Sequence, residues 1–258
     1  MRGLTLIAAC ALTGCQFRID GNSATTADAS VTADLAPPAT HDPPADLAPP
    51  VAVPDLASPP DLTPPSELFV TSTPMSGTID LTQVGTIDWA HYGFSSATSF
   101  DDKATGGQRI STLTALPNSG AQGQSTATAI QYSWSDGATG TGHQMTATSS
   151  NTDVFVSNGG QTLHVPAGVE PRRLIVYVAV LSASARFDVS LSDNSQPPFS
   201  STQSPTDAID HGFAYTIDFA ANSPGQTLTV SWSLVTPTSM TSFGAGVGAA
   251  ALTTPPSN

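Results

Sequence analysis

The stretch Arg172–Leu181, "RRLIVYVAVL", decides the fold, because its apolar residues occupy both odd and even positions. Successive side chains of a β-strand point to opposite faces, so this run predicts a central strand that is covered on both sides. The next run, 185–192 ("ARFDVSLS"), alternates apolar with polar residues and predicts a strand with one face in water. The two runs together predict a layered β structure.

The same short alternating pattern extends from about residue 67 to residue 258, with no helical periodicity of any length. The predicted strands span 77–82, 85–93, 129–135, 152–157, 161–166, 172–181, 185–192, 213–220 and 226–235. Turn residues such as "SDG", "NGG" and "NSPG" separate them. The run "GAGVGAA" from Gly244 is predicted to be a tightly packed last strand. The predicted fold class is all-β, a single antiparallel, jelly-roll-like β-sandwich.

The first fifteen residues, "MRGLTLIAACALTGC", contain one basic residue followed by an apolar run that is too short to span a membrane. This pattern predicts an export signal over residues 1–14, the alternative being a buried amphipathic start to the fold. Leu12-Thr13-Gly14-Cys15 resembles the bacterial lipobox. The resemblance implies that Cys15 is lipidated and anchors the chain to a membrane. Gln16, in place of Asp, favours the outer membrane if the host has one.

Residues 15–66 are predicted to form a disordered linker rich in Pro, Ala and Asp. Half of the 22 prolines lie between Ala33 and Pro65. Proline fixes φ and the aspartates repel one another, so the segment is expected to be an extended, semi-rigid spacer. The alternative is a ligand for proline-recognition domains.

Charge and cysteine content exclude several classes of function. The chain has 20 acidic and 7 basic residues, and such a balance repels a phosphate backbone, so nucleic acid is not an expected partner. Cys10 is lost with the signal and Cys15 carries the lipid. The mature chain is therefore expected to lack disulfides and zinc–thiolate sites.

Several motifs follow one another along the predicted domain. They are "GTIDWAHYG" (85–93), "FDDKATGGQRIS" (100–111), "YSWSDGA" (132–138), "RRLIVYV" (172–178), "SLSDNSQP" (190–197) and "GQTLTVSW" (225–232). In this order they resemble a β-sandwich module of secreted and surface proteins of bacteria, similar in shape to galactose-binding-like and jelly-roll accessory domains. Tyr92 stands where those modules usually have Trp. The resemblance implies a fold and a setting, with no catalytic residues to carry over.

The motif "DWAHY" allows a core interpretation and a site interpretation. Trp89 shares a strand phase with Ile87 and is predicted to belong to the core rather than to an exposed sugar platform. His91 is predicted to be a hydrogen-bonded residue at a strand end. Asp88 and Tyr92 lie in the opposite phase, which is predicted to face solvent, and are the candidates for ligand contact.

Two other groups are weaker candidates. Asp101 and Asp102 are predicted to lie in a solvated loop, where adjacent carboxylates could alternatively hold a structural Ca²⁺ ion. Arg172 and Arg173 are predicted to form an exposed basic pair that could meet a glycan carboxylate. No other cofactor is expected.

The sequence thus leads to one main hypothesis: a membrane-anchored, non-catalytic envelope lipoprotein that displays a β-sandwich for binding or adhesion, with glycan as a candidate ligand. The alternative is an architectural envelope protein that contacts only other proteins. A hydrolase would need carboxylates gathered in a cleft, whereas the acids of this sequence are scattered.

Overall fold

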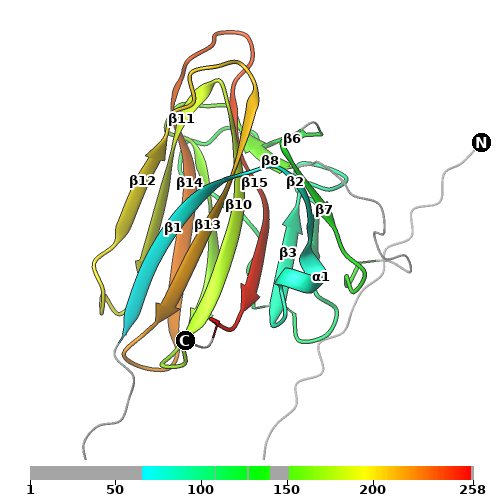
Figure 1. Ribbon diagram of the computed structural model, residues 1–258. Coiled ribbons are helices and arrows are strands. Elements are labelled where there is room, and N and C mark those ends of the chain that lie inside the picture. Colours follow the sequence, from blue (N-terminus) through cyan, green and yellow to red (C-terminus); the bar gives the residue numbers. More distant parts are fainter. Residues whose placement is uncertain (1–65, 108, 127, 140–150, 257–258) are drawn as a thin grey trace, which may run out of the picture. The chain divides into compact units, whose positions relative to one another are not determined.

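The computed structural model describes residues 66–107, 109–126, 128–139 and 151–256, and nearly all of their regular secondary structure is β-strand (Figure 1). The predicted signal, Cys15 and the predicted linker up to residue 65 lie outside the described residues. The strands are β1 Glu67–Met75, β2 Gly77–Asp80, β3 Asp88–Tyr92, β4 Phe100–Asp102, β5 Thr114–Ala115, β6 Gly123–Ser125, β7 Ile130–Ser133 and β8 Asn151–Val154. The series continues with β9 Gly160–Ala167, β10 Arg172–Leu181, β11 Ala183–Leu191, β12 Phe199–Gln203, β13 Asp210–Ala220, β14 Gln226–Pro237 and β15 Gly244–Thr253, and the one described helix is α1 Leu81–Val84.

Two antiparallel sheets pack face to face, which confirms the predicted β-sandwich (Figure 1). The larger sheet has the order β1-β13-β10-β15-β3-β4, with β8 and β6 added beside the first part of β15. The smaller sheet has the order β12-β11-β14-β9-β5. A third, two-stranded sheet pairs β2 with β7 in parallel, an exception to the predicted antiparallel pairing.

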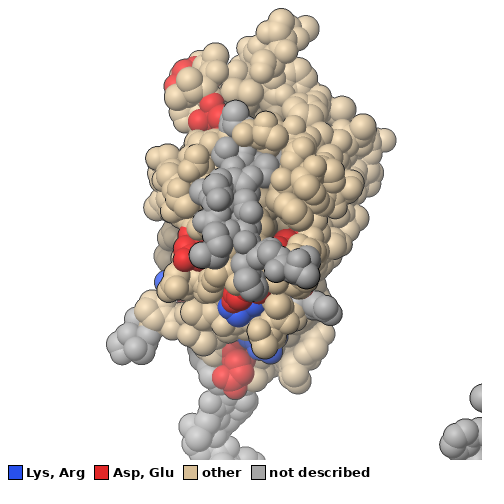
Figure 2. All heavy atoms as spheres, turned by 90° about the vertical axis from the view of Figure 1, so that its right-hand side faces the viewer, with Lys and Arg blue, Asp and Glu red and all other residues tan. Residues whose placement is uncertain are grey.

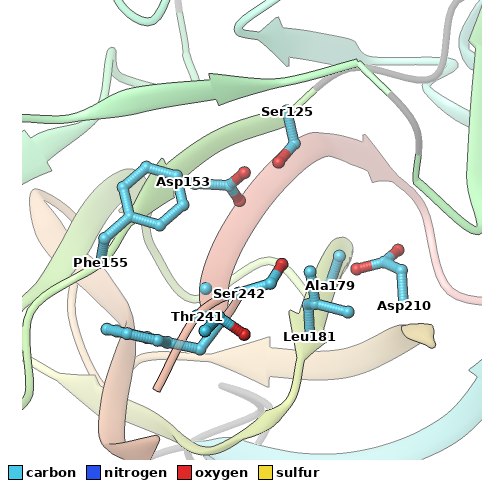
Figure 3. Close-up of a pocket in the computed structure, with 10 residues that line it drawn as sticks. Ser125, Asp153, Phe155, Ala179, Leu181, Asp210, Thr241 and Ser242 are labelled. Carbon is cyan, nitrogen blue, oxygen red and sulfur yellow. The ribbon is translucent and has the colours of Figure 1, made fainter. Parts of the chain in front are cut away.

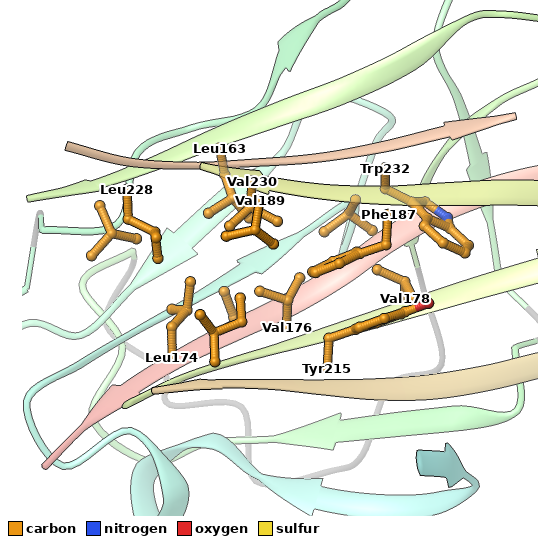
Figure 4. Close-up of a cluster of buried hydrophobic side chains, with 14 of the residues drawn as sticks. Leu163, Leu174, Val176, Val178, Phe187, Val189, Tyr215, Leu228, Val230 and Trp232 are labelled. Carbon is orange, nitrogen blue, oxygen red and sulfur yellow. The ribbon is translucent and has the colours of Figure 1, made fainter. Parts of the chain in front are cut away.

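The main core lies between the two large sheets (Figure 4). Phe187 of β11 stacks on Tyr215 of β13 with ring centroids 3.7 Å apart, and Trp232 of β14 packs beside both rings. Aliphatic side chains such as Val176 and Val230 fill the rest of the layer. The polar side chains of β11 lie on the opposite, partly exposed face, as its alternating sequence predicts.

A second, smaller core covers the outer face of the larger sheet. There β2, β7 and α1 pack on β3, β10 and β15, and the buried residues of this outer layer include Trp89, Tyr132 and Tyr177. The prediction that β10 is covered on both sides is therefore confirmed. Strand β15 is also buried on both sides, and its glycine and alanine residues leave the space that close packing of two layers requires.

Some predicted strands were wrong in extent, and others were not predicted. The predicted strand 77–82 ends at Asp80, whose carboxylate accepts the Thr82 N–H and starts α1. Strands β1, β4, β5, β6 and β12 were not predicted, because their sequences alternate weakly or are very short. No helix in the described part of the chain is long and apolar enough to cross a membrane.

Candidate functional site

Asp88 is fully buried, so the prediction that it faces solvent is wrong. One of its carboxylate oxygens accepts the backbone N–H of Arg109 at 2.8 Å and of Ile110 at 2.9 Å, and the other accepts the N–H of Trp89 at 2.9 Å. Burial raises the pKa of Asp88, and these three hydrogen bonds oppose the rise. Asp88 thus fixes the loop that follows β4 and does not present a surface for a ligand.

Tyr92 is buried as well, because its phase of β3 points into the main core rather than into water. Its hydroxyl donates to the carbonyl of Ser111 at 2.8 Å, and burial raises its pKa far above the usual range. The period-2 alternation was read correctly, but both faces of β3 are covered. The prediction that Tyr92 is a ligand contact is therefore wrong.

Asp101 and Asp102 are buried in β4, so the predicted solvated loop is also wrong. The Asp101 carboxylate accepts the backbone N–H of Asp102 at 3.0 Å and of Thr139 at 2.8 Å. In the part of the chain that the structure describes, no group of three or more His, Cys, Asp or Glu side chains could hold a metal ion. The Asp101 carboxylate thus organises the backbone of β4 and of the segment around Thr139.

Lys103, Asp136 and Trp89 form a polar cluster beneath the outer layer. Asp136 accepts the Trp89 indole N–H at 2.8 Å and the Thr82 hydroxyl at 2.6 Å, and it pairs with the Lys103 ammonium at 2.7 Å. Lys103 also donates to the carbonyl of Gly85 at 3.1 Å. Partial burial acts to raise the pKa of Asp136, but these partners hold it below the usual range. The motifs "DWAHY", "FDDK" and "YSWSDG" are therefore joined by these hydrogen bonds and this ion pair, which hold the segments together.

The arginine pair does not form one basic patch, because adjacent strand residues point to opposite faces. Arg173 makes two hydrogen bonds of 2.7 Å to the Asp218 carboxylate on the neighbouring strand β13. Both arginines are only partly exposed. Among the residues drawn in colour in Figure 2, charged atoms are few and scattered over the side that it shows.

His91 is enclosed by aromatic rings, with the Trp134 and Tyr132 centroids each 4.9 Å away. Neither ring nitrogen has a hydrogen-bond partner among the described residues, so the prediction of a hydrogen-bonded histidine is wrong. Burial lowers its pKa to about 3, and the ring is neutral at physiological pH.

A pocket of about 340 Å³ lies at one end of the larger sheet (Figure 3). Strand register creates it: Leu181 at the end of β10 lies opposite Asp210 of β13 on one side and Gly244 of β15 on the other. Asp153 of β8 pairs with Gly246 of β15. Residues from distant parts of the sequence therefore converge at one place.

Two carboxylates and three hydroxyls give this pocket its polar groups. Asp153 and Asp210 point toward the space between them in Figure 3, and Ser125, Thr241 and Ser242 complete the polar lining. The ring of Phe155 lies over two glycines of the neighbouring strands, since a Cβ at Gly123 would meet this ring at 2.2 Å and a Cβ at Gly244 would meet it at 3.1 Å. Phe243 also lines the pocket, while its side chain packs against the main core.

Burial makes both pocket carboxylates weaker acids than usual. It raises the pKa of Asp153 to about 7, with the nearby Asp210 adding to the rise and a hydrogen bond with Ser125 opposing it. Burial also raises the pKa of Asp210, while the backbone N–H of Ala129, 2.8 Å from its carboxylate, opposes that rise. Near neutral pH, Asp153 therefore exchanges between its two protonation states.

Most of the exposed apolar side chains belong to the segments that line the pocket. Five large hydrophobic side chains are exposed among the described residues, and four of them line the pocket or adjoin a lining residue in sequence: Phe155, Val156, Ile209 and Met240. Phe69 on β1 is the fifth. Met240 is 93% exposed, in the loop that leads into β15.

The pocket was missed at the level of sequence. Asp153 and Asp210 were treated as scattered acids, whereas the fold brings them into one cavity. The only local signal was an aspartate two positions before a phenylalanine, and so in the same phase, in the predicted strand 152–157. No protein-family model, curated protein or solved structure matches the chain, so its function is argued from this geometry.

Proposed function

We propose that this chain is a lipid-anchored envelope protein that displays a non-catalytic β-sandwich as a binding module, and that its ligand enters the Asp153–Asp210 pocket. The pocket carries the binding part of the proposal, because convergent polar groups and aromatic rings in one cavity are the usual make-up of a small-ligand site. The anchoring part rests on the lipobox resemblance of Leu12–Cys15 and on the proline-rich segment that follows it.

A glycan is the ligand class that this lining supports best. The exposed Phe155 ring in the lining offers apolar surface to the C–H groups of a sugar ring, and the three hydroxyls can exchange hydrogen bonds with sugar hydroxyls. An architectural role would need none of these groups to converge.

The test uses the full chain, purified in detergent, on a panel of polysaccharides and glycans. The parent is expected to be retained by at least one of them, and an Asp153→Ala/Asp210→Ala variant is expected to lose that retention. Asp188→Ala is the matched control, because Asp188 is a partly exposed acid of β11 in the other sheet. Loss of retention with this control, or no retention of the parent, would favour the architectural alternative.

A paired-carboxylate pocket is also the arrangement that glycoside hydrolases use. The same experiment distinguishes the two functions if the bound glycan is incubated with the parent and its new reducing ends are measured. Retention without new reducing ends supports a binding module. New reducing ends that disappear in the double variant would assign catalysis to the pocket instead.

A further inference from the structure

The charge of the pocket restricts its ligand further. Among the residues that the structure describes, the lining has two carboxylates and no Lys or Arg side chain. His211 acts on Asp210 from the next position, but its ring already pairs with Asp207. An anionic ligand would oppose ionisation of Asp153 and Asp210, whereas a cationic ligand would stabilise their ionised forms over the neutral ones.

The aromatic rings point to the same class of ligand. Phe155 and Phe243 line the cavity together with the acids, and the faces of phenyl rings attract a desolvated ammonium group. The two glycines beneath Phe155 fix how closely its ring approaches the sheet. Carboxylates and ring faces in one small cavity therefore form a site for an amine.

The hydroxyl groups in the lining favour an amino sugar over a simple amine as the ligand. Ser125 on β6 and Thr241 and Ser242 before β15 lie around the acids and can bond to sugar hydroxyls. We infer that the pocket binds an amino sugar with a free amine, whose ammonium group lies between Asp153 and Asp210. This inference rests on the proposed function and names its ligand class.

The experiment measures binding of four probes to the full chain in detergent by titration calorimetry: glucosamine, N-acetylglucosamine, glucose and 1,5-diaminopentane. Glucosamine is expected to bind at least tenfold more tightly than glucose or N-acetylglucosamine, because it is the one sugar of the three that carries an ammonium group. It is also expected to bind more tightly than the diamine, which has no ring or hydroxyls to use the rest of the site.

Variants place the binding in the pocket. Asp153→Asn and Asp210→Asn keep the side-chain size and a hydrogen-bond acceptor, and each is expected to weaken glucosamine binding at least tenfold. Asp188→Asn should leave it unchanged. Circular dichroism spectra of all variants establish that a loss of binding does not come from unfolding.

The other outcomes separate the inference from the proposed function. Equal binding of glucose and glucosamine would overturn the ammonium assignment and leave glycan binding intact. Diamine binding as tight as that of glucosamine would overturn the sugar assignment. If no probe binds but the parent is still retained on a glycan, the amino-sugar inference fails and the proposed function stands. If no probe binds and no glycan retains the parent, both proposals fail.

Discussion

The indole N–H of Trp89 donates to the carboxylate of Asp136 at 2.8 Å, and this contact joins the second residue of "DWAHY" to the loop after β7. Trp89 is fully buried and packs on Trp134, with ring centroids 5.7 Å apart. The contact ties the outer layer to the larger sheet. The prediction from sequence that Trp89 belongs to the core is confirmed.

Truncation of Trp89 is expected to unfold the domain. Trp89→Ala removes a large buried ring and should lower the free energy of unfolding by roughly 3–5 kcal/mol, a large part of an ordinary domain's stability. Trp89→Phe keeps most of the packing and loses the bond to Asp136, so it should cost less. Chemical denaturation followed by circular dichroism measures both. A Trp89→Ala protein as stable as the parent would contradict the core assignment.

Truncation of Asp88 is expected to lower the free energy of unfolding nearly as much as truncation of Trp89. Asp88→Ala leaves the buried N–H groups of Arg109 and Ile110 without their acceptor, and an unsatisfied buried group costs about 1–3 kcal/mol. Denaturation should therefore show a loss of at least about 2 kcal/mol. Asp188→Ala, which removes a partly exposed carboxylate, is the control and should change little. Equal effects of the two substitutions would refute the role assigned to Asp88.

The comparison of Asp88 with Arg172–Leu181 shows what one sequence can reveal. The β10 run is apolar in both phases, so its sequence alone predicts that both faces of the strand are covered. Strand β3 instead carries an acid, Asp88, in the same phase as Tyr92, and this acid suggested water where the structure has the main core. The clue lay in β15, its neighbour in the sheet, whose small residues fit cover on both sides.

The pocket could not be derived in the same way, because no local pattern encodes it. Asp153 meets Asp210 only through the registers of β8 on β15, β15 on β10 and β10 on β13. Each register depends on contacts between residues far apart in sequence. The composition of a strand predicts that it pairs, but not which residue lies opposite which.

The buried His91 should make the protein sensitive to acid. Its pKa is about 3 in the folded state and about 6.5 when unfolded, so between these values the unfolded chain binds more protons. Stability should then fall by up to roughly 1.4 kcal/mol per pH unit as pH drops below about 6.5. His91→Phe is expected to reduce this loss, because a phenyl ring takes up no proton in the unfolded chain. Melting curves at pH 4.5 and 7 test it.

The matched control for His91 is His164→Phe, since His164 is exposed on β9 and bonds only to the Thr229 hydroxyl through its ring. This variant should keep the acid sensitivity of the parent. If His91→Phe and His164→Phe have the same dependence of melting temperature on pH as the parent, the buried histidine is not its source.

Lipid attachment at Cys15 is tested apart from the fold. Cells that express the parent are expected to incorporate labelled fatty acid into the protein, and Cys15→Ser is expected to abolish the label. Cys10→Ser is the matched control, because Cys10 lies in the predicted signal and should leave the label intact. Label retained by Cys15→Ser, or lost with Cys10→Ser alone, would remove the basis for the anchoring proposal.

Asp153 should act on stability in the opposite direction to His91. Its pKa is about 7 in the folded state and about 3.9 when unfolded, so between these values the folded protein binds more protons. The stability conferred by the buried neutral acid is present below about pH 4 and is lost as pH rises toward 7, by as much as about 4 kcal/mol.

Asp153→Asn, which cannot ionise, should therefore be markedly more stable than the parent at pH 8 and similar to it at pH 4. Asp188→Asn should show no such difference. Thermal melts of the three proteins at both pH values decide the matter, and an Asp153→Asn protein that gains nothing at pH 8 would mean that the pocket does not hold a neutral acid.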